Sequence, residues 1–154
     1  MKAKDGILDQ LGEILTAELT AVHQYLLHAE LCRHWGYERL TEKFQHLYTE
    51  EITHSGQLVR HMLYLGGQPD VGKLEAVKGG RSVQELFETN LAFERDDVEM
   101  LRKAIAHAAK VVGARAVLVG RDERDGVPGL VRATGAAGAV DVGVGRVGHF
   151  VVDD

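Results

Sequence analysis

Three acidic side chains and one histidine stand in apolar patterns where ordinary core residues would be expected: Glu18, Glu51, His54 and Glu94. They follow the three- and four-residue spacing of their apolar neighbours, so each is predicted to face the protein interior. The apolar residues that flank them are Leu15 and Val22, Leu47 and Leu58, and Leu91 and Val98. An ionised carboxylate in a low-dielectric interior is costly unless a cation neutralises it, and no Lys or Arg occupies a stripe position beside these acids. A bound metal ion would remove this cost.

Glu51 and His54 are three positions apart, so they share one helix face and can approach the same ion. A hard carboxylate beside an imidazole suits iron, manganese or zinc better than a metal that prefers thiolates. A single inward glutamate is more often a residue at a solvated helix edge, but acids in register on three helices favour a metal centre. His46 and Glu50 also share a helix face by spacing. Because they fall partly off the apolar stripe, we interpret them either as a solvated pair or as a second metal site.

Two long amphipathic helices are predicted in the first part of the chain. The first runs from Asp5 to about Trp35, where Gly36 ends it. The second begins at about Arg39 and its apolar stripe continues to Leu65. The stripe residues of the two helices, apart from the interrupting acids, are Leu8, Leu11, Leu15, Val22, Tyr25 and Ala29, then Leu40, Phe44, Leu47, Leu58 and Leu65. The short turn between the helices makes them antiparallel neighbours.

A segment rich in glycine, residues 66–80, predicts a crossover long enough to run the length of the bundle. Ser82 and Glu85 have the spacing of a capping box, so a third helix is predicted to begin there. Its predicted stripe contains Phe87, Leu91, Val98, Leu101 and Ile105. The order of elements therefore predicts a helical bundle with a long connection between its second and third helices.

The predicted helices bring the candidate ligands to similar heights along the bundle. Glu18 lies 17 residues before Trp35, and His54 lies 15 residues after Arg39. With a rise of about 1.5 Å per residue, Glu18 and His54 are expected within one turn of each other. Glu94 lies near the middle of its helix and can meet them whichever way that helix runs. The acids and the histidine are therefore expected to converge on one interior point.

Length and composition exclude several classes of protein. A chain of 154 residues has the size of one domain with a buried core. A formal charge of −5 argues against nucleic acid as the main partner, and no apolar run approaches the ~20 residues of a membrane span. The single Cys32 cannot form an internal disulfide, and no apolar signal-like region follows the N-terminus. We therefore expect a protein of the reducing cytoplasm that binds neither nucleic acid nor membrane.

The composition changes near Val112, which divides the chain into residues 1–112 and residues 113–154. The second part holds nine of the 18 glycines and is poor helix material, because each interior glycine costs about 1 kcal/mol relative to alanine. Residues 143–148 match G-x-G-x-x-G, but a dinucleotide site also needs a helix and a second strand after this motif. We therefore interpret residues 113–154 as a frame-disrupted C-terminus, the end of a degenerate subunit, or a divergent native ending.

At these residues the sequence resembles bacterioferritin, over about residues 1–112. The segments that carry the resemblance are Glu18-Leu-Thr-Ala-Val-His-Gln-Tyr25, Trp35-Gly36, Glu51-Ile-Thr-His54, Leu63-Tyr-Leu-Gly-Gly-Gln-Pro69 and Leu91-Ala-Phe-Glu94. The resemblance implies an all-α, ferritin-like four-helix bundle, in which one glutamate from each of two helices joins a Glu-x-x-His pair from each of the other two. The fourth helix of such a bundle is expected to be poorly formed or divergent here, because residues 113–154 stand in its place.

The resemblance also implies a function. Bacterioferritins form a hollow shell of 24 subunits, oxidise Fe(II) with dioxygen or peroxide at a di-iron site inside each bundle, and store ferric mineral in the shell. Glu18 and Glu94 look like the single acids of that site, and Glu51 with His54 looks like one of its two pairs, with Glu51 bridging the irons. The resemblance assigns two further roles: electron transfer to Tyr25 and Trp35, and an iron site on the inner surface to His46 with Glu50. By spacing alone, Tyr25 is a core residue or a redox residue near the metal.

Two departures from the family pattern matter. The family binds haem through a methionine at the position of Ile52, whose side chain has no atom that can ligate iron. Haem binding is therefore not expected here. The second Glu-x-x-His pair is also absent, because Val127 and Leu130 stand where it belongs and the sole Glu and His after residue 112, Glu123 and His149, are 26 residues apart.

These departures leave three functional hypotheses. The first is an iron-storage subunit with ferroxidase activity, whose own site is incomplete. The second is a non-catalytic subunit that co-assembles with intact subunits into a mixed shell. The third is a small soluble di-metal oxidase of the same bundle class that forms no shell.

Overall fold

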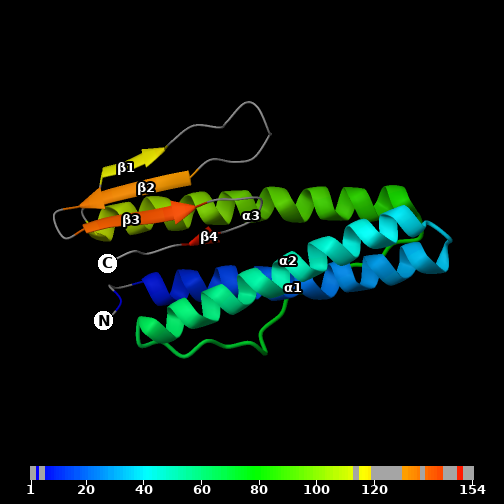
Figure 1. Ribbon diagram of the computed structural model, residues 1–154, viewed down its shortest axis with the longest axis horizontal. Coiled ribbons are helices and arrows are strands. Elements are labelled where there is room, and N and C mark those ends of the chain that lie inside the picture. Colours follow the sequence, from blue (N-terminus) through cyan, green and yellow to red (C-terminus); the bar gives the residue numbers. More distant parts are fainter. Residues whose placement is uncertain are drawn as a thin grey trace.

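The computed structural model describes residue 3, residues 6–112, and the backbone of residues 115–118, 130–135, 138–143 and 149–150. Three long helices dominate the described part: α1 (Ile7–His34), α2 (Glu38–Tyr64) and α3 (Val83–Val112) (Figure 1). Their bounds agree with the sequence prediction to within two residues where both ends were predicted. No described helix is long and apolar enough to cross a membrane.

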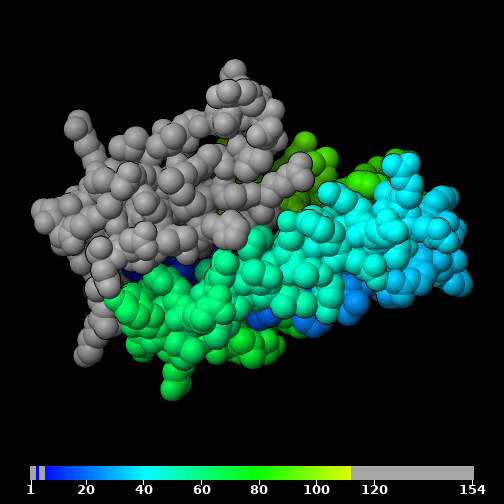
Figure 2. All heavy atoms as spheres, in the orientation of Figure 1, coloured from blue at the N-terminus to red at the C-terminus, as the bar shows by residue number. Residues whose placement is uncertain are grey.

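The turn between α1 and α2 is built around Gly36, as the sequence predicts. Gly36 has a φ of +81°, a left-handed conformation that costs glycine little and other residues more. Tyr37 N–H donates to Cys32 C=O at 2.9 Å across this turn, which satisfies one of the free carbonyls at the end of α1. The chain reverses within a few residues, so α2 runs back along α1 over most of its length (Figure 1), and side chains of α2 lie over those of α1 in the space-filling view (Figure 2).

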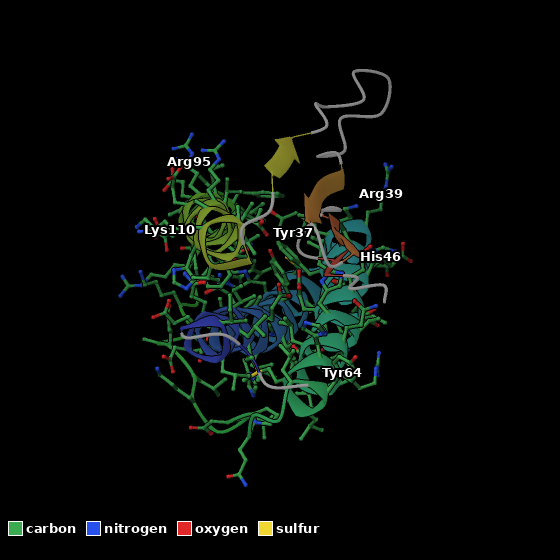
Figure 3. All side chains as sticks on the ribbon, turned by 90° about the vertical axis from the view of Figure 1, so that its left-hand side faces the viewer. Tyr37, Arg39, His46, Tyr64, Arg95 and Lys110 are labelled. Atoms are coloured by element: carbon green, nitrogen blue, oxygen red, sulfur yellow. The ribbon has the colours of Figure 1, made fainter. Side chains whose placement is uncertain are left out.

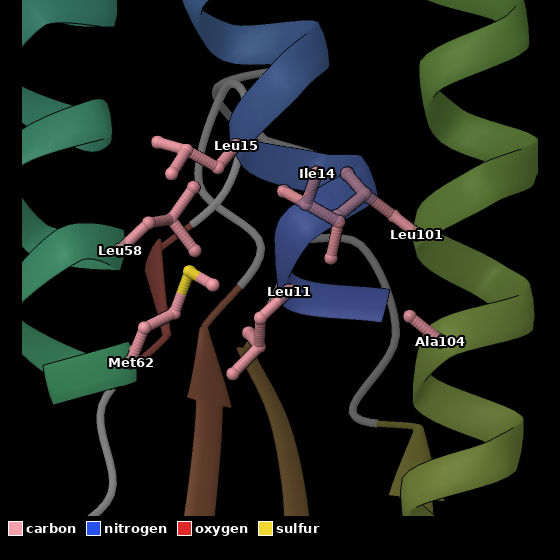
Figure 4. Packing of buried hydrophobic residues seen from close by; sticks show 7 residues of the cluster. All are labelled: Leu11, Ile14, Leu15, Leu58, Met62, Leu101 and Ala104. Carbon is pink, nitrogen blue, oxygen red and sulfur yellow. The ribbon is translucent and has the colours of Figure 1, made fainter. Parts of the chain in front are cut away.

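α1 is the central helix of the bundle and packs against both α2 and α3. At one end, Leu11, Ile14 and Leu15 of α1 lie between residues of the two neighbouring helices (Figure 4). The residues on either side are Leu58 and Met62 of α2, and Leu101 and Ala104 of α3. A second buried cluster fills the other half of the bundle, with Tyr25 and Cys32 of α1, Phe44 of α2 and Leu86 of α3. The polar residues of the candidate site lie between these two apolar clusters along α1.

The crossover between α2 and α3 is held to α1 by three buried polar side chains spaced four residues apart. Thr20 Oγ1 accepts a hydrogen bond from Glu75 N–H at 3.0 Å, and Gln24 Oε1 accepts one from Lys78 N–H at 3.4 Å. His28 Nε2–H donates to Lys78 C=O at 2.8 Å. These contacts satisfy backbone groups of an extended segment that has no strand partner of its own.

The same polar face of α1 also sets the position of α3. Gln24 Nε2 donates to Asn90 Oδ1 at 2.8 Å, and Asn90 Nδ2 donates to His28 Nδ1 at 3.0 Å. All three side chains are buried. Because Nε2 of His28 donates to a carbonyl and Nδ1 accepts from an amide, this network requires the neutral imidazole.

The buried face of α3 differs from the predicted stripe. The prediction was wrong for Phe87, Leu91 and Val98, which are 51%, 53% and 43% exposed. Leu101 is buried as predicted, but the other buried residues of α3 are Leu86, Asn90, Asp97 and Ala104. The predicted residues lie on a neighbouring face of α3, where a fourth helix would pack in a four-helix bundle. One half of the predicted capping box of α3 is present, with Glu85 N–H donating to Ser82 Oγ at 3.3 Å, while Glu85 Oε2 accepts from Arg81 N–H at 2.8 Å, one residue before Ser82.

Where the fourth helix of the bundle was expected, the described backbone forms short strands: β1 (Arg115–Leu118), β2 (Leu130–Gly135), β3 (Gly138–Gly143) and β4 (His149–Phe150). They form one antiparallel sheet in the order β1-β2-β3-β4. β1 contacts α3 and β4 contacts α2, so the sheet lies at the end of the bundle where α3 ends (Figure 1). The expected all-α, ferritin-like arrangement therefore holds for the helices of residues 6–112. The G-x-G-x-x-G segment lies largely outside the described residues.

The Gln24–Asn90–His28 network predicts a specific loss of stability. In Asn90→Leu, the side chain keeps a similar size but leaves the buried amide of Gln24 and the Nδ1 of His28 without partners. We expect the free energy of unfolding in urea to fall by about 2 kcal/mol. The control Gln84→Leu makes the same kind of change at an exposed position of α3 and should change it by less than about 0.5 kcal/mol. Equal losses in the two variants would contradict the role of the network.

His28 also predicts how stability depends on pH. Burial lowers the pKa of His28 below its ordinary value of 6.5, although the hydrogen bond to Lys78 opposes this shift. As the pH falls below about 6.5 the unfolded chain therefore takes up the proton first, and the free energy of unfolding decreases. His28→Gln should reduce the difference in stability between pH 7.5 and pH 5.5, measured by urea unfolding. His34→Gln, an exposed histidine of the same helix, should leave that difference unchanged.

Candidate metal centre

Glu18 of α1 and Glu51 with His54 of α2 meet in the interior between the two helices. Glu18 and Glu51 are each 2% exposed and His54 is 5% exposed. One potential ligand atom from each residue lies within 4.8 Å of the other two. His54 Nδ1 is 3.0 Å from Glu51 Oε2 and 3.5 Å from Glu18 Oε2. The structure thus brings together the three residues that the sequence predicted to converge from these helices.

Burial and close charges shift the pKa values of Glu18 and His54 strongly. Neither carboxylate oxygen of Glu18 makes a hydrogen bond within the described part of the chain. Burial, with the nearby charge of Glu51, raises the pKa of Glu18 to about 9, against the opposing effect of His54. Burial lowers the pKa of His54, but the nearby carboxylates of Glu18 and Glu51 outweigh this and raise it to about 10. Without a metal ion, protons on these two residues therefore offset the buried negative charge.

Glu94 of α3 lies beside this group and is half-buried. Its Oε1 accepts a short hydrogen bond from the hydroxyl of Tyr25, which is itself buried on α1. Burial raises the pKa of Glu94, as does the charge of Glu51, while the bond from Tyr25 lowers it. Burial also raises the pKa of Tyr25, and the adjacent Glu94 raises it further. The tyrosine is therefore a neutral hydrogen-bond donor placed next to the candidate ligands.

Asp97, one turn after Glu94 on α3, is a site residue that the sequence analysis missed. It is 6% exposed, and its Oδ1 has no hydrogen-bond partner within the described chain. Burial and the charges of Glu94 and Glu51 raise its pKa to about 7, against the effect of His54. Asp97 lies four residues before Leu101 and three after Glu94, a helical spacing that could have identified it as a buried residue. The predicted apolar stripe on α3 contained Val98 instead, so Asp97 was not recognised.

The residues present fit a metal centre by two observations. Glu18, Glu51, Glu94 and Asp97 border a cavity of about 10 Å³, roughly the space of one water-sized particle. Three of these acids are almost fully buried, and the described residues provide no Lys or Arg as their partner in an ion pair. Carboxylates with one imidazole are donors that iron, manganese and zinc accept. Glu18, Glu51 and His54 are the residues that would hold the first ion.

The other predicted site residues lie outside this interior group. His46 and Glu50 are an exposed pair on α2, with His46 Nδ1 3.3 Å from Glu50 Oε2, and His46 points away from the bundle (Figure 3). Trp35 follows the last residue of α1 and packs, partly buried, on the cluster that contains Tyr25. Ile52 is 46% exposed on α2. The geometry therefore separates the surface pair His46 and Glu50 from the buried acids.

Comparison with known proteins agrees with the fold of the three helices. The sequence pattern of the ferritin-like domain matches residues 8–115. The chain belongs to the ferritin family. Its helical part is 32% identical over 107 residues to bacterial ferritin of Paramagnetospirillum magnetotacticum, a match that covers 70% of this chain and 65% of that protein. Bacterioferritin of Rhodobacter capsulatus is 32% identical over 111 residues, which cover 72% of this chain and 69% of the relative.

A solved structure of the Rhodobacter capsulatus bacterioferritin superposes with a TM-score of 0.71 over 72% of this chain and 69% of that chain, at 32% sequence identity. That structure is described as having a metal-free dinuclear site and a haem iron. The ferritin-like match thus spans about two thirds of the length of these relatives. It includes every predicted ligand of this chain, from Glu18 to Glu94, and ends at the start of the segment that forms strands.

The buried carboxyl of Glu18 gives a testable prediction. Since its raised pKa keeps it protonated at pH 7, Glu18→Gln replaces it with a neutral side chain of the same shape. We expect the metal-free variant to melt at the same temperature as the parent protein or higher. Zn²⁺ at 100 times its dissociation constant should stabilise the parent protein by about 2.7 kcal/mol. This stabilisation should be lost in Glu18→Gln.

The matched control is Glu13→Gln, an exposed glutamate of the same helix, which should behave as the parent protein does. Melting temperatures with and without Zn²⁺ measure both effects. A metal-free Glu18→Gln protein that is less stable than the parent, or one that still gains the full stabilisation by zinc, would refute this assignment.

Proposed function

We propose that this chain is an iron-storage subunit of bacterioferritin type that oxidises Fe(II) with dioxygen or peroxide at the buried Glu18, Glu51 and His54 group. The observation that carries the proposal is this group itself, in which two glutamates and one histidine from two helices converge, with no Lys or Arg of the described residues in an ion pair with them. The membership of the chain in the ferritin family supports iron as the metal. Glu94 is the acid that α3 contributes, and Tyr25 is its hydrogen-bond partner.

The reaction takes Fe(II) as substrate. Two Fe(II) ions each give up one electron, and one dioxygen molecule takes up both electrons and two protons to form hydrogen peroxide. Carboxylates favour the product, because anionic oxygen ligands bind Fe(III) more strongly than Fe(II) and so stabilise the oxidised state. In this chain Glu51 lies 3.0 Å from His54 and borders the same cavity as Glu94 and Asp97, so it would be a ligand at the centre of the group. The hydroxyl of Tyr25 holds Glu94 in place through its hydrogen bond.

The proposal includes an assembly and a location. The oxidised iron would be stored as ferric mineral inside an oligomeric shell of 24 subunits, built from this chain alone or mixed with other subunits. We also propose that such a subunit acts in the cytoplasm. His46 and Glu50, exposed on α2, are proposed as an iron site on the inner surface of the shell. We propose that the chain binds no haem at the position of Ile52, since an isoleucine offers no ligand.

A second candidate function is supported by the missing ligand pair. The family pattern places a second Glu-x-x-His pair on the fourth helix, and residues 127 and 130 of this chain are Val and Leu. A chain with ligands for a single ion would be a non-catalytic subunit that co-assembles with intact partners. The third alternative, a di-metal oxidase without a shell, differs from both in its assembly.

Rapid mixing of the anaerobic Fe(II)-loaded chain with dissolved oxygen separates the first two candidates. We expect Fe(III) to form with one dioxygen consumed per two Fe(II), measured by ferric absorbance and an oxygen electrode. Glu51→Gln should slow the reaction at least tenfold, because it removes a charged ligand shared by both ions. Glu42→Gln, an exposed glutamate of the same helix, should retain the parent rate. Oxidation no faster than that of free Fe(II) in buffer would favour the non-catalytic subunit.

Analytical ultracentrifugation of the same preparation addresses the assembly. A storage protein with a cavity should sediment as a large closed shell, whether formed by this chain alone or with a co-expressed ferritin subunit. A monomer or dimer that still oxidises Fe(II) would support the third alternative and would exclude storage in a cavity.

A further inference from the structure

Asp97 is a buried carboxylate for which the described part of the chain supplies no Lys or Arg in an ion pair, although the charge of His54 acts on it. It is 6% exposed, and its Oδ1 lies in the interior without a hydrogen bond. Its neighbour on α3, Arg95, points away from the bundle and is exposed (Figure 3). A buried carboxylate with an unsatisfied oxygen carries a desolvation cost that a structural role alone does not explain.

The surroundings of Asp97 are those of the proposed metal centre. Asp97 borders the same small cavity as Glu18, Glu51 and Glu94. It follows Glu94 by three residues on α3, so the two carboxylates project from the same side of the helix one turn apart. This is the spacing of the Glu51 and His54 pair on α2. α3 therefore offers a Glu-x-x-Asp pair opposite the Glu-x-x-His pair of α2.

We infer that Asp97 is a metal ligand, and that with Glu94 and Glu51 it binds a second divalent cation beside the ion held by Glu18, Glu51 and His54. The inference deepens the proposed function and rests on it. Oxygen ligands from three carboxylates suit a hard cation such as Fe(II) or Mn(II). The second ion would then be held by residues of α2 and α3 alone, without any ligand from the segment after residue 112.

The position of Asp97 also explains why a second ion could be held in a chain that lacks the second Glu-x-x-His pair. Glu94 alone offers one carboxylate, and one of its oxygens already accepts the hydrogen bond from Tyr25. Asp97 adds a carboxylate whose Oδ1 is unengaged. Together with Glu51 they bring three acids to one ion, which is enough negative charge to neutralise a divalent cation.

Anaerobic titration of the metal-free protein with Co(II), followed by calorimetry and by the visible absorption of bound cobalt, tests the inference without depending on activity. The parent protein should bind two Co(II) per subunit. Asp97→Asn, which keeps the shape of the side chain and removes its charge, should retain one site and bind the second ion at least tenfold more weakly. Asp96→Asn changes an exposed aspartate at the adjacent position and should bind two ions as the parent does.

The outcomes distinguish this inference from the function on which it rests. Two sites of parent affinity in Asp97→Asn, or a single site in the parent that this variant leaves unchanged, would overturn the inference while the metal centre stands. A parent protein that binds no Co(II) would overturn the metal centre as well. Should Asp97→Asn fail to fold, a cobalt-soaked crystal of the parent decides the point. A second cobalt within about 2.5 Å of an Asp97 oxygen supports the inference, and its absence there overturns it.

Discussion

The fold is organised around carboxylates that are buried without a Lys or Arg partner in the part of the chain that the structure describes. Glu18, Glu51 and Asp97 are almost fully enclosed, and within the described residues His54 is the nearest group that can carry a positive charge. Such an interior is unfavourable for a protein whose sole task is to be stable, because apolar residues would fill the same space at lower cost. The acids are therefore best understood as a preformed place for cations, which stabilise the folded chain when they bind.

α1 makes this arrangement possible because it presents two kinds of polar residue to its neighbours. Glu18 and Tyr25 face the metal centre, whereas Gln24 hydrogen-bonds to the crossover and to α3. Asn90, the partner of Gln24, lies two turns before Asp97 on the same face of α3. The hydrogen bond between Gln24 and Asn90 therefore helps to set the position of α3 along the axis of α1. It thereby helps to place Asp97 at the level of Glu18.

The contrast between α2 and α3 shows what hydrophobic periodicity can reveal. On α2, Leu47 and Leu58 flank the ligands and define the buried face, so Glu51 and His54 could be predicted from spacing. On α3 the face that packs on α1 carries Asn90 and Asp97, and a search for apolar residues passes over it. The apolar residues of the neighbouring face were therefore mistaken for the core. The strands after residue 114 could not be located either, since Gly- and Val-rich sequence excludes a stable helix without specifying which residues pair.

This chain departs from a four-helix bundle and lacks the second Glu-x-x-His pair. The position of the remaining acids depends less on the fourth helix than the loss of that pair suggests. Glu18 is positioned by the packing of α1 on α2, and Glu94 and Asp97 are positioned by the contacts of α3 with Tyr25 and Gln24. None of these contacts involves a residue after 112. A fourth helix would cover the exposed apolar face of α3 and add ligands. Within the described residues, the contacts that bring the carboxylates together are made by the three helices themselves, and this closeness is the condition for binding cations at all.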